Sequence, residues 1–113
     1  MNNNIRMTKI DDEIKECLSE IIRFELSDPR INNSLISIIK TKTSKDLEHC
    51  IVYVSVLDKN KIDIIKILNK AQGYIRKLIA SKINLRVTPD FKFILDDSIE
   101  YSEKINALLN KLS

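Results

Sequence analysis

A single glycine, Gly73, is the feature that most restricts what this 113-residue chain can fold into. Phosphate-binding loops and dinucleotide-binding turns need several glycines, because their backbone N–H groups must approach the phosphates closely. Gly73 also separates two runs of helical periodicity, residues 62–71 and 75–79, and a glycine costs about 1 kcal/mol inside a continuous helix. We therefore predict a kink or corner at Gly73, with a positive φ or close helix packing. Gly73→Val is then expected to destabilise the fold by at least about 1 kcal/mol.

Apolar residues at helical spacing predict a first helix in the N-terminal quarter of the chain. Thr8 is expected to cap this helix, with Asp11 completing an acidic variant of the capping box. Asp28-Pro29 is expected to end it, because a residue before proline is disfavoured in the α region. Residues 1–7 are expected to form a flexible N-terminus.

The rest of the chain alternates between strand and helix patterns. The turn Ser44-Lys45-Asp46 is short, so the strands that flank it are expected to pair antiparallel. The expected elements after the first helix are strands at 34–43 and 50–56, helices at 62–71 and 75–79, a strand at 91–95 and a last helix at 98–112. This order predicts one domain over residues 1–113 with an α+β fold, in which helices pack on a small sheet.

The chain has only two cysteines and one histidine, so few residues are available to form a catalytic or metal site. Cys17 and Cys50 lie in apolar periodic segments and are predicted to be small buried hydrophobes. His49 adjoins the strand at 50–56 and is predicted to be a half-exposed strand residue. It is therefore an unsuitable base for a serine nucleophile, and no second histidine completes a zinc site. We predict that the protein is not an enzyme and has no cofactor, metal or small-molecule substrate.

Charges interrupt every apolar run before it reaches the roughly 18 residues that cross a membrane. Residues 1–6 lack the apolar segment of a secretory signal. The protein is therefore expected to be a cytoplasmic monomer without a membrane partner.

Positive charge is concentrated in one segment, residues 59–92. This segment holds nine Lys or Arg residues and two acids, for a net charge of +7, whereas the whole chain has +3. Cations that gather around a helix corner with few acids are typical of a polyanion site. Nucleic acid is the favoured partner, and an acidic protein or a membrane surface are the alternatives.

Short motifs occur in a fixed order from about Thr8 to Leu112. They are Asp28-Pro29-Arg30, Ser44-Lys45-Asp46-Leu47, Val52-Tyr53-Val54-Ser55, Ala71-Gln72-Gly73-Tyr74-Ile75-Arg76, Leu85-Arg86 with Pro89, Phe91 and Phe93, Asp96-Asp97-Ser98, and 105–109. At this spacing the chain resembles the ribosome-binding factor A family of bacterial small-subunit assembly factors. Cys50 stands where the family more often has alanine. The chain stops soon after its expected last helix, so the resemblance does not extend to a longer C-terminal tail or to any role of such a tail.

The resemblance implies a type II KH-like fold in which Ala71-Gln72-Gly73 replaces the Gly-x-x-Gly clamp of KH domains. It also implies a non-catalytic RNA-binding factor that binds free or immature small ribosomal subunits and their ribosomal RNA. Such a factor assists late small-subunit maturation and RNA processing, and it is linked to growth in the cold. The alternative is a protein-interaction module whose basic helix pair meets an acidic protein surface.

The predicted RNA-binding residues lie around the helix corner and near the hairpin. Arg86 could instead be a packing or salt-bridge residue, and Arg30 could brace the loop after the first helix. Replacing Arg76 and Lys77 with glutamine is expected to weaken binding with little change in thermal stability. The full set is Lys70, Gln72, Gly73, Arg76, Lys77, Lys82 and Arg86 at the corner, with Lys40, Lys42 and Lys45 at the hairpin.

Overall fold

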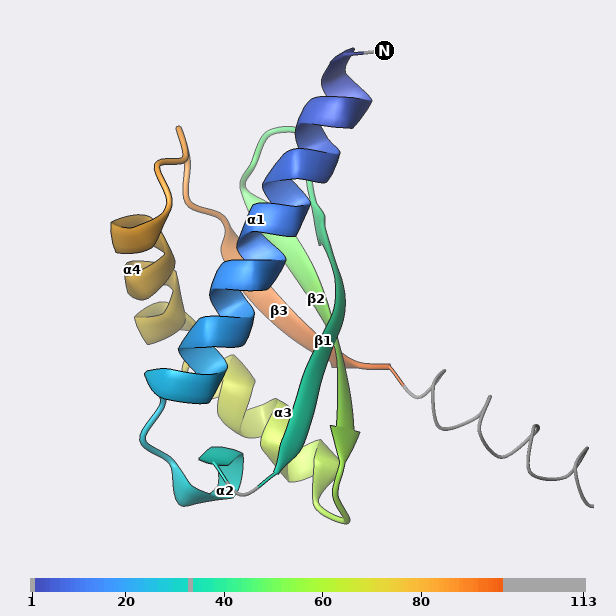
Figure 1. The fold of residues 1–113 in the computed structure, drawn as a ribbon, viewed down its shortest axis with the longest axis vertical. Helices are drawn as coiled ribbons and strands as arrows, with labels where there is room; N and C mark the ends of the chain where they lie inside the picture. Colours follow the sequence, from blue (N-terminus) through green and yellow to red (C-terminus); the bar gives the residue numbers. More distant parts are fainter. Residues whose placement is uncertain (1, 33, 97–113) are drawn as a thin grey trace, which may run out of the picture.

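The computed structural model describes residues 2–32 and 34–96 of the chain (Figure 1). The elements are α1 (Asn2–Phe24), α2 (Pro29–Asn32), β1 (Leu35–Thr43), β2 (His49–Leu57), α3 (Lys61–Lys70), α4 (Gln72–Lys82) and β3 (Asp90–Leu95). This order confirms the predicted α+β architecture as far as β3, and the helix expected at 98–112 lies outside the described residues. No helix in the described ranges is long and apolar enough to cross a membrane.

The three strands form one sheet in the order β1-β2-β3. β1 and β2 pair antiparallel, as the short turn between them predicts. β3 lies parallel to β2, with Phe91 opposite Cys50, and this pairing requires the long crossover through α3 and α4. β1 and β3 are therefore the edge strands of the described sheet.

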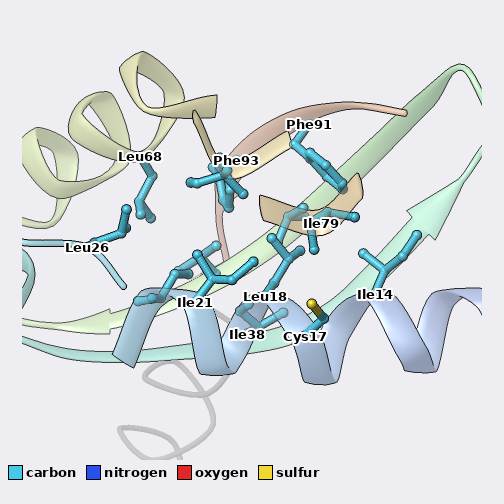
Figure 2. Close-up of a cluster of buried hydrophobic side chains, with 14 of the residues drawn as sticks. Ile14, Cys17, Leu18, Ile21, Leu26, Ile38, Leu68, Ile79, Phe91 and Phe93 are labelled. Carbon is cyan, nitrogen blue, oxygen red and sulfur yellow. The ribbon is translucent and has the colours of Figure 1, made fainter. Parts of the chain in front are cut away.

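The helices pack on one face of the sheet and enclose a single core. Every second residue of β2 points into it: Cys50, Val52, Val54 and Val56 are at most 1% exposed, as their alternation predicts. Figure 2 shows Leu18 of α1, Leu68 of α3 and Ile79 of α4 in one cluster with Phe91 and Phe93 of β3. Because all three long helices share this core, the opposite face of the sheet carries none of them.

The first helix differs from its prediction at the start. α1 begins at Asn2, so Thr8 lies inside the helix and does not cap it. Residues 2–7 contain neither proline nor glycine, so nothing in this segment interrupts a helix that is docked through its apolar face further along. The flexibility expected of residues 1–7 stays a prediction. α1 ends at Phe24, before Asp28-Pro29, and Pro29 opens the short helix α2, which was not predicted.

Asp11, expected to complete the cap, instead joins α1 to β1. Its backbone oxygen accepts a hydrogen bond from Thr41 Oγ1 (2.7 Å), and its Oδ1 accepts from Thr43 N (3.0 Å) and Thr43 Oγ1 (2.5 Å). Both threonines face the helix because the register of β1 shifts between Ile38 and Lys40, as in a β-bulge. The bulge moves the inward positions from even to odd residue numbers.

The turn of the hairpin is held by side-chain hydrogen bonds. Ser44 Oγ donates to Asp46 Oδ1 (2.6 Å), and Glu48 N donates to the same oxygen (3.0 Å). Hydrogen bonds that favour the carboxylate hold the pKa of Asp46 below its usual range, with the Ser44 hydroxyl the largest cause. Leu47 takes a φ of 64°, so a leucine occupies the left-handed region at this turn.

Candidate nucleic-acid interface

One residue, Ala71, joins α3 to α4. Its N–H donates to Ile67 O (3.0 Å), and its carbonyl accepts from Ile75 N (2.9 Å), so Ala71 belongs to the hydrogen-bond ladders of both helices. Its ψ of 1° departs from the helical value and turns the chain. The predicted corner between two helices is confirmed, with its turning point at Ala71.

Gly73 does not play the part predicted for it. It is the second residue of α4, it has no positive φ, and a Cβ atom added to it would meet nothing within 4 Å. The expectations of a positive φ and of close packing at Gly73 are therefore wrong. The destabilisation expected of Gly73→Val stays a prediction, and the structure removes both of its stated reasons. The corner bends because Ala71 leaves the helical region, and the fold itself makes no demand for glycine at position 73.

The inner side of the corner is tied to the free edge of β3. Asn69 Nδ2 donates to Phe93 O (3.0 Å), and Phe93 N donates to Asn69 Oδ1 (2.8 Å). Phe91 N lies 3.4 Å from Gln72 Oε1, which accepts from it. An edge strand leaves backbone groups unpaired, and these amides satisfy them in place of a fourth strand.

Arg76 continues this row of contacts. Its Nε and Nη2 both donate to Thr88 O, at 3.2 and 3.0 Å, and its Nε lies 3.8 Å from Asp90 Oδ1. Gln72 and Arg76 were predicted as RNA ligands, but their side chains engage the start and edge of β3. Asn69 was not predicted, although the spacing of residues 69, 72 and 76 places them along one side of consecutive helices.

Lys82 is also engaged within the protein. Its Nζ lies 3.5 Å from Glu25 Oε1, and Glu13, Glu16 and Glu20 of α1 line the same shallow groove. These acids lower the positive potential at Lys82, and the expected contribution of this lysine to a polyanion site is reduced accordingly.

The outer side of the corner presents exposed basic and aromatic residues. Lys66 and Lys70 lie four residues apart on α3, and both are exposed; Gly73 and Lys77 have the same spacing and exposure on α4. Tyr74 is 52% exposed, an aromatic residue that was absent from the predicted site. The first turn of α4 holds no acid, so its N–H groups and the lysines favour an anion together.

The remaining predicted cations lie elsewhere. Lys40 and Lys42 project from β1 on the face of the sheet that lacks the three long helices, and Lys45 lies in the hairpin turn. Arg86 is exposed in the connection between α4 and β3. The predicted set is therefore divided between the corner, the opposite sheet face and the loops.

Arg30 braces its loop. Its backbone N and Nε donate to Asp28 Oδ1 (2.9 and 3.2 Å), and its Nη2 donates to Asp28 Oδ2 (3.0 Å). The guanidinium hydrogen bonds hold the pKa of Asp28 below its usual range. Of the two roles considered for Arg30, the bracing role is the one that these contacts display.

The two cysteines are free and buried, as predicted. Burial raises the pKa of Cys17 and raises that of Cys50 to about 11. Because the thiolate is the reactive form, burial opposes nucleophilic chemistry at both thiols. His49 is an exposed residue at the start of β2, with its Nδ1 3.9 Å from Asp90 Oδ2. Among the residues described, no group of three His, Cys, Asp or Glu side chains could hold a metal ion.

Comparison with known proteins relates the whole chain to one family. A family model described as ribosome-binding factor A matches residues 6–109. Ribosome-binding factor A of Caldicellulosiruptor saccharolyticus is 49% identical over 111 residues, which cover 96% of this chain and 82% of that protein. The protein of the same name from Clostridium botulinum is 39% identical over 112 residues and covers 96% of both chains.

Solved structures share the fold. The crystal structure of ribosome-binding factor A from Thermus thermophilus aligns with a TM-score of 0.70 at 24% identity, covering 79% of this chain and 94% of that one. A homology model of the Thermus thermophilus protein, fitted into a cryo-electron microscopy map of its 30S complex, aligns with a TM-score of 0.64 at 23% identity. That alignment covers 77% of this chain and 91% of the other. The expected KH-like α+β fold is thereby confirmed.

Proposed function

The chain belongs to the ribosome-binding factor A family, and from this premise we propose that it binds the small ribosomal subunit through ribosomal RNA. It acts without catalysis as a cytoplasmic assembly factor for free or immature subunits. In that role it assists late maturation and RNA processing and supports growth in the cold. The binding partner is the one with which the related Thermus thermophilus protein forms its 30S complex.

The outer side of the helix corner is the observation that supports this proposal. Lys66, Lys70 and Lys77 are exposed there around Gly73 and Tyr74, and none of them meets the acids of α1 as Lys82 does. Two acids, Asp28 and Asp63, line a shallow groove with Lys66 and Lys70, and Asp28 is already paired with Arg30. RNA phosphates would meet the lysines, and the open backbone at Gly73 lets a sugar-phosphate chain approach closely.

Arg76 has a different part in the proposal. Its guanidinium holds Thr88 O, so Arg76→Gln removes hydrogen bonds that shape the approach to β3 and lowers thermal stability. The Arg76 and Lys77 double variant would therefore confuse folding with binding. Lys70→Gln with Lys77→Gln is the cleaner pair, because both side chains are exposed and glutamine keeps helix propensity.

Sedimentation with ribosomal particles tests the proposal. The wild-type protein should co-sediment with free small subunits and not with translating ribosomes. The Lys70→Gln, Lys77→Gln variant should bind more weakly, and the slope of log affinity against log salt should fall by roughly 0.7 to 0.9 for each phosphate that a lysine no longer neutralises. Lys9→Gln with Lys15→Gln on α1 removes the same charge and should leave affinity nearly unchanged.

The protein-interaction alternative predicts a different result in the same experiment. A module for an acidic protein would bind intact subunits but not protein-free small-subunit ribosomal RNA. Salt-dependent binding to the protein-free RNA, weakened by the corner variant and not by the α1 control, supports RNA as the partner. Equal binding by both variants would place the RNA surface away from the corner.

A further inference from the structure

The face of the sheet opposite the three long helices has an ordered pattern of cations and apolar side chains. Lys40, Tyr53 and Ile94 are cross-strand neighbours on β1, β2 and β3. The next row on this face consists of Lys42, Ile51 and Lys92. Figure 1 shows α1 crossing the other face of the same three strands.

The charge on this face is positive. Its three lysines are exposed, whereas Tyr53, Ile51 and Ile94 are half-buried between them. Among the outward-facing positions of the described strands, the one acid is Asp90, at the end where β3 begins. Asp90 already lies 3.8 Å from Arg76 Nε and 3.9 Å from His49 Nδ1, so its charge is partly balanced.

We infer that this face is a second RNA site, in which an unpaired base stacks on Tyr53 and Lys40, Lys42 and Lys92 contact the flanking phosphates. The inference rests on the proposed function in taking RNA as the ligand, but its residues and its side of the molecule are different. Aromatic rings among lysines on an open sheet are the usual means of holding single strands, since every base has a π-face.

The contact between Lys40 and Tyr53 indicates how the site receives a base. Lys40 Nζ lies 4.7 Å from the centroid of the Tyr53 ring. A cation over a partly exposed ring is held more weakly than a stacked base. A base can therefore replace the ammonium group on the ring, and the long lysine side chain then reaches a phosphate beside it.

Single-stranded RNA fits this face better than duplex RNA does. The bases of an A-form duplex are stacked on one another, and the duplex offers phosphates and 2′-hydroxyl groups to its partners. A duplex could use the three lysines but not Tyr53. The ring therefore distinguishes the two ligands, and the binding of each can be measured separately.

Tyrosine fluorescence gives a direct reading of the site. The chain has three tyrosines and no tryptophan, so Tyr74→Phe with Tyr101→Phe leaves Tyr53 as the dominant emitter at 280 nm excitation. Titration of this full-length variant with a single-stranded adenosine dodecamer should quench the emission in a saturable way. A duplex of the same length should quench it much less. No quenching, or equal quenching by both RNAs, would overturn the inference.

Substitutions at Tyr53 separate stacking from packing. Tyr53→Leu should weaken binding of a fluorescein-labelled dodecamer by roughly 10-fold, because an alkyl side chain offers no π-face. Tyr53→Phe keeps the ring and should bind within about 2-fold of the wild type. Thermal melts identify any loss of fold. A Tyr53→Leu variant that melts normally and binds normally would overturn the inference, as would a Tyr53→Phe variant as weak as Tyr53→Leu.

The lysines and the corner variant complete the test. Lys40→Gln, Lys42→Gln and Lys92→Gln together should lower the salt slope for the dodecamer by about 2, at roughly 0.7 for each single-strand contact. The corner variant Lys70→Gln, Lys77→Gln should leave Tyr53 quenching intact. Loss of subunit binding in the corner variant, with no effect of Tyr53→Leu on the dodecamer, would sink this inference and leave the proposed function standing. Quenching of Tyr53 by RNA, without any binding of the protein to small subunits, would contradict the proposed function and leave this inference standing.

Discussion

Two turns of this molecule, the hairpin turn between β1 and β2 and the corner between α3 and α4, differ in which residue adopts the unusual backbone conformation. In the hairpin turn, a φ of 64° falls on Leu47, although left-handed backbone costs a non-glycine residue about 1 to 2 kcal/mol. At the helix corner, the only glycine of the chain has no positive φ and has open space beside it. The residue best suited to a strained turn is therefore absent from the strained turn.

The hydrogen bonds of the two regions explain the contrast. Around the hairpin, the Ser44, Asp46 and Asp11 side chains all bond to neighbouring parts of the same fold, and these bonds offset the strain at Leu47. At the corner, bonds of this kind lie on the inner side, where Asn69, Gln72 and Arg76 contact β3 and the segment before it. The side chains of Ser44, Asp46 and Asp11 stabilise the hairpin end, whereas at the corner such bonds lie on the inner side and the outer side is exposed.

Removing the Asn69 hydrogen bonds on the inner side of the corner should have the largest effect on stability. Asn69→Leu leaves the N–H and C=O of Phe93 without partners at the edge of β3, and each unsatisfied group costs about 1 to 3 kcal/mol. We expect the free energy of unfolding to fall by about 3 kcal/mol, measured by urea denaturation. Asn84→Ala replaces an exposed asparagine and should stay within about 0.5 kcal/mol of the wild type. Equal effects of the two variants would show that the amides do not hold β3.

Removing the Asp11 hydrogen bonds that join α1 to β1 should lower stability by a smaller amount. Asp11→Ala removes the carboxylate that accepts both Thr43 hydrogen bonds, and bonds to a charged group are worth about 1.5 to 3 kcal/mol. Because Asp11 is half-buried and water can replace part of the loss, we expect about 2 kcal/mol. Asp12→Ala, at the exposed neighbouring position, is the matched control. If both variants denature at the same urea concentration, the bulge of β1 is not held by Asp11.

Cys50, which pairs with Thr43 at the base of the hairpin, adds a pH dependence. Burial raises the pKa of its thiol to about 11 in the folded protein, above an unfolded value near 9. The stability held below pH 9 is therefore lost as the pH rises towards 11, because the unfolded chain releases the proton first. At pH 10 the loss amounts to about 1 kcal/mol by linkage. Cys50→Ala should show a flatter decline from about pH 8 to about pH 10 than the wild type, and parallel declines would contradict this assignment.

These contrasts also separate what the sequence predicts from what it does not. The apolar pattern predicts the strand at 50–56, because a period of two places Cys50, Val52, Val54 and Val56 on one face of a strand, and that face is buried in the structure. The start of α1 was missed because polar residues at a helix end carry no periodicity, and docking elsewhere in the helix decides how far it extends.

The charge composition of residues 59–92 predicted that a basic site exists, but it did not identify which residues form the site. Charge counts identified a basic segment, but they could not show that Arg76 reaches Thr88 or that Lys82 meets Glu25, since these partners are distant in sequence. The glycine was interpreted through its backbone freedom, the commonest reason for glycine at a bend. In this fold Ala71 makes the bend, which tertiary packing imposes on an ordinary residue.

The smallest change in stability is expected at Gly73, on the outer side of the helix corner. Gly73→Ala should raise the free energy of unfolding by about 0.5 kcal/mol, because the helical site accepts a Cβ atom and alanine restricts the unfolded chain. The same variant should bind small subunits more weakly if RNA approaches the backbone there. Ala80→Gly, at an exposed position of the same helix, should lower stability by a similar amount and leave binding unchanged. If Gly73→Ala raises the free energy of unfolding but lowers the affinity for small subunits, then glycine is required at position 73 for binding and not for the fold. A Gly73→Ala variant that is more stable and binds as tightly as the wild type would show that RNA does not approach the chain at Gly73.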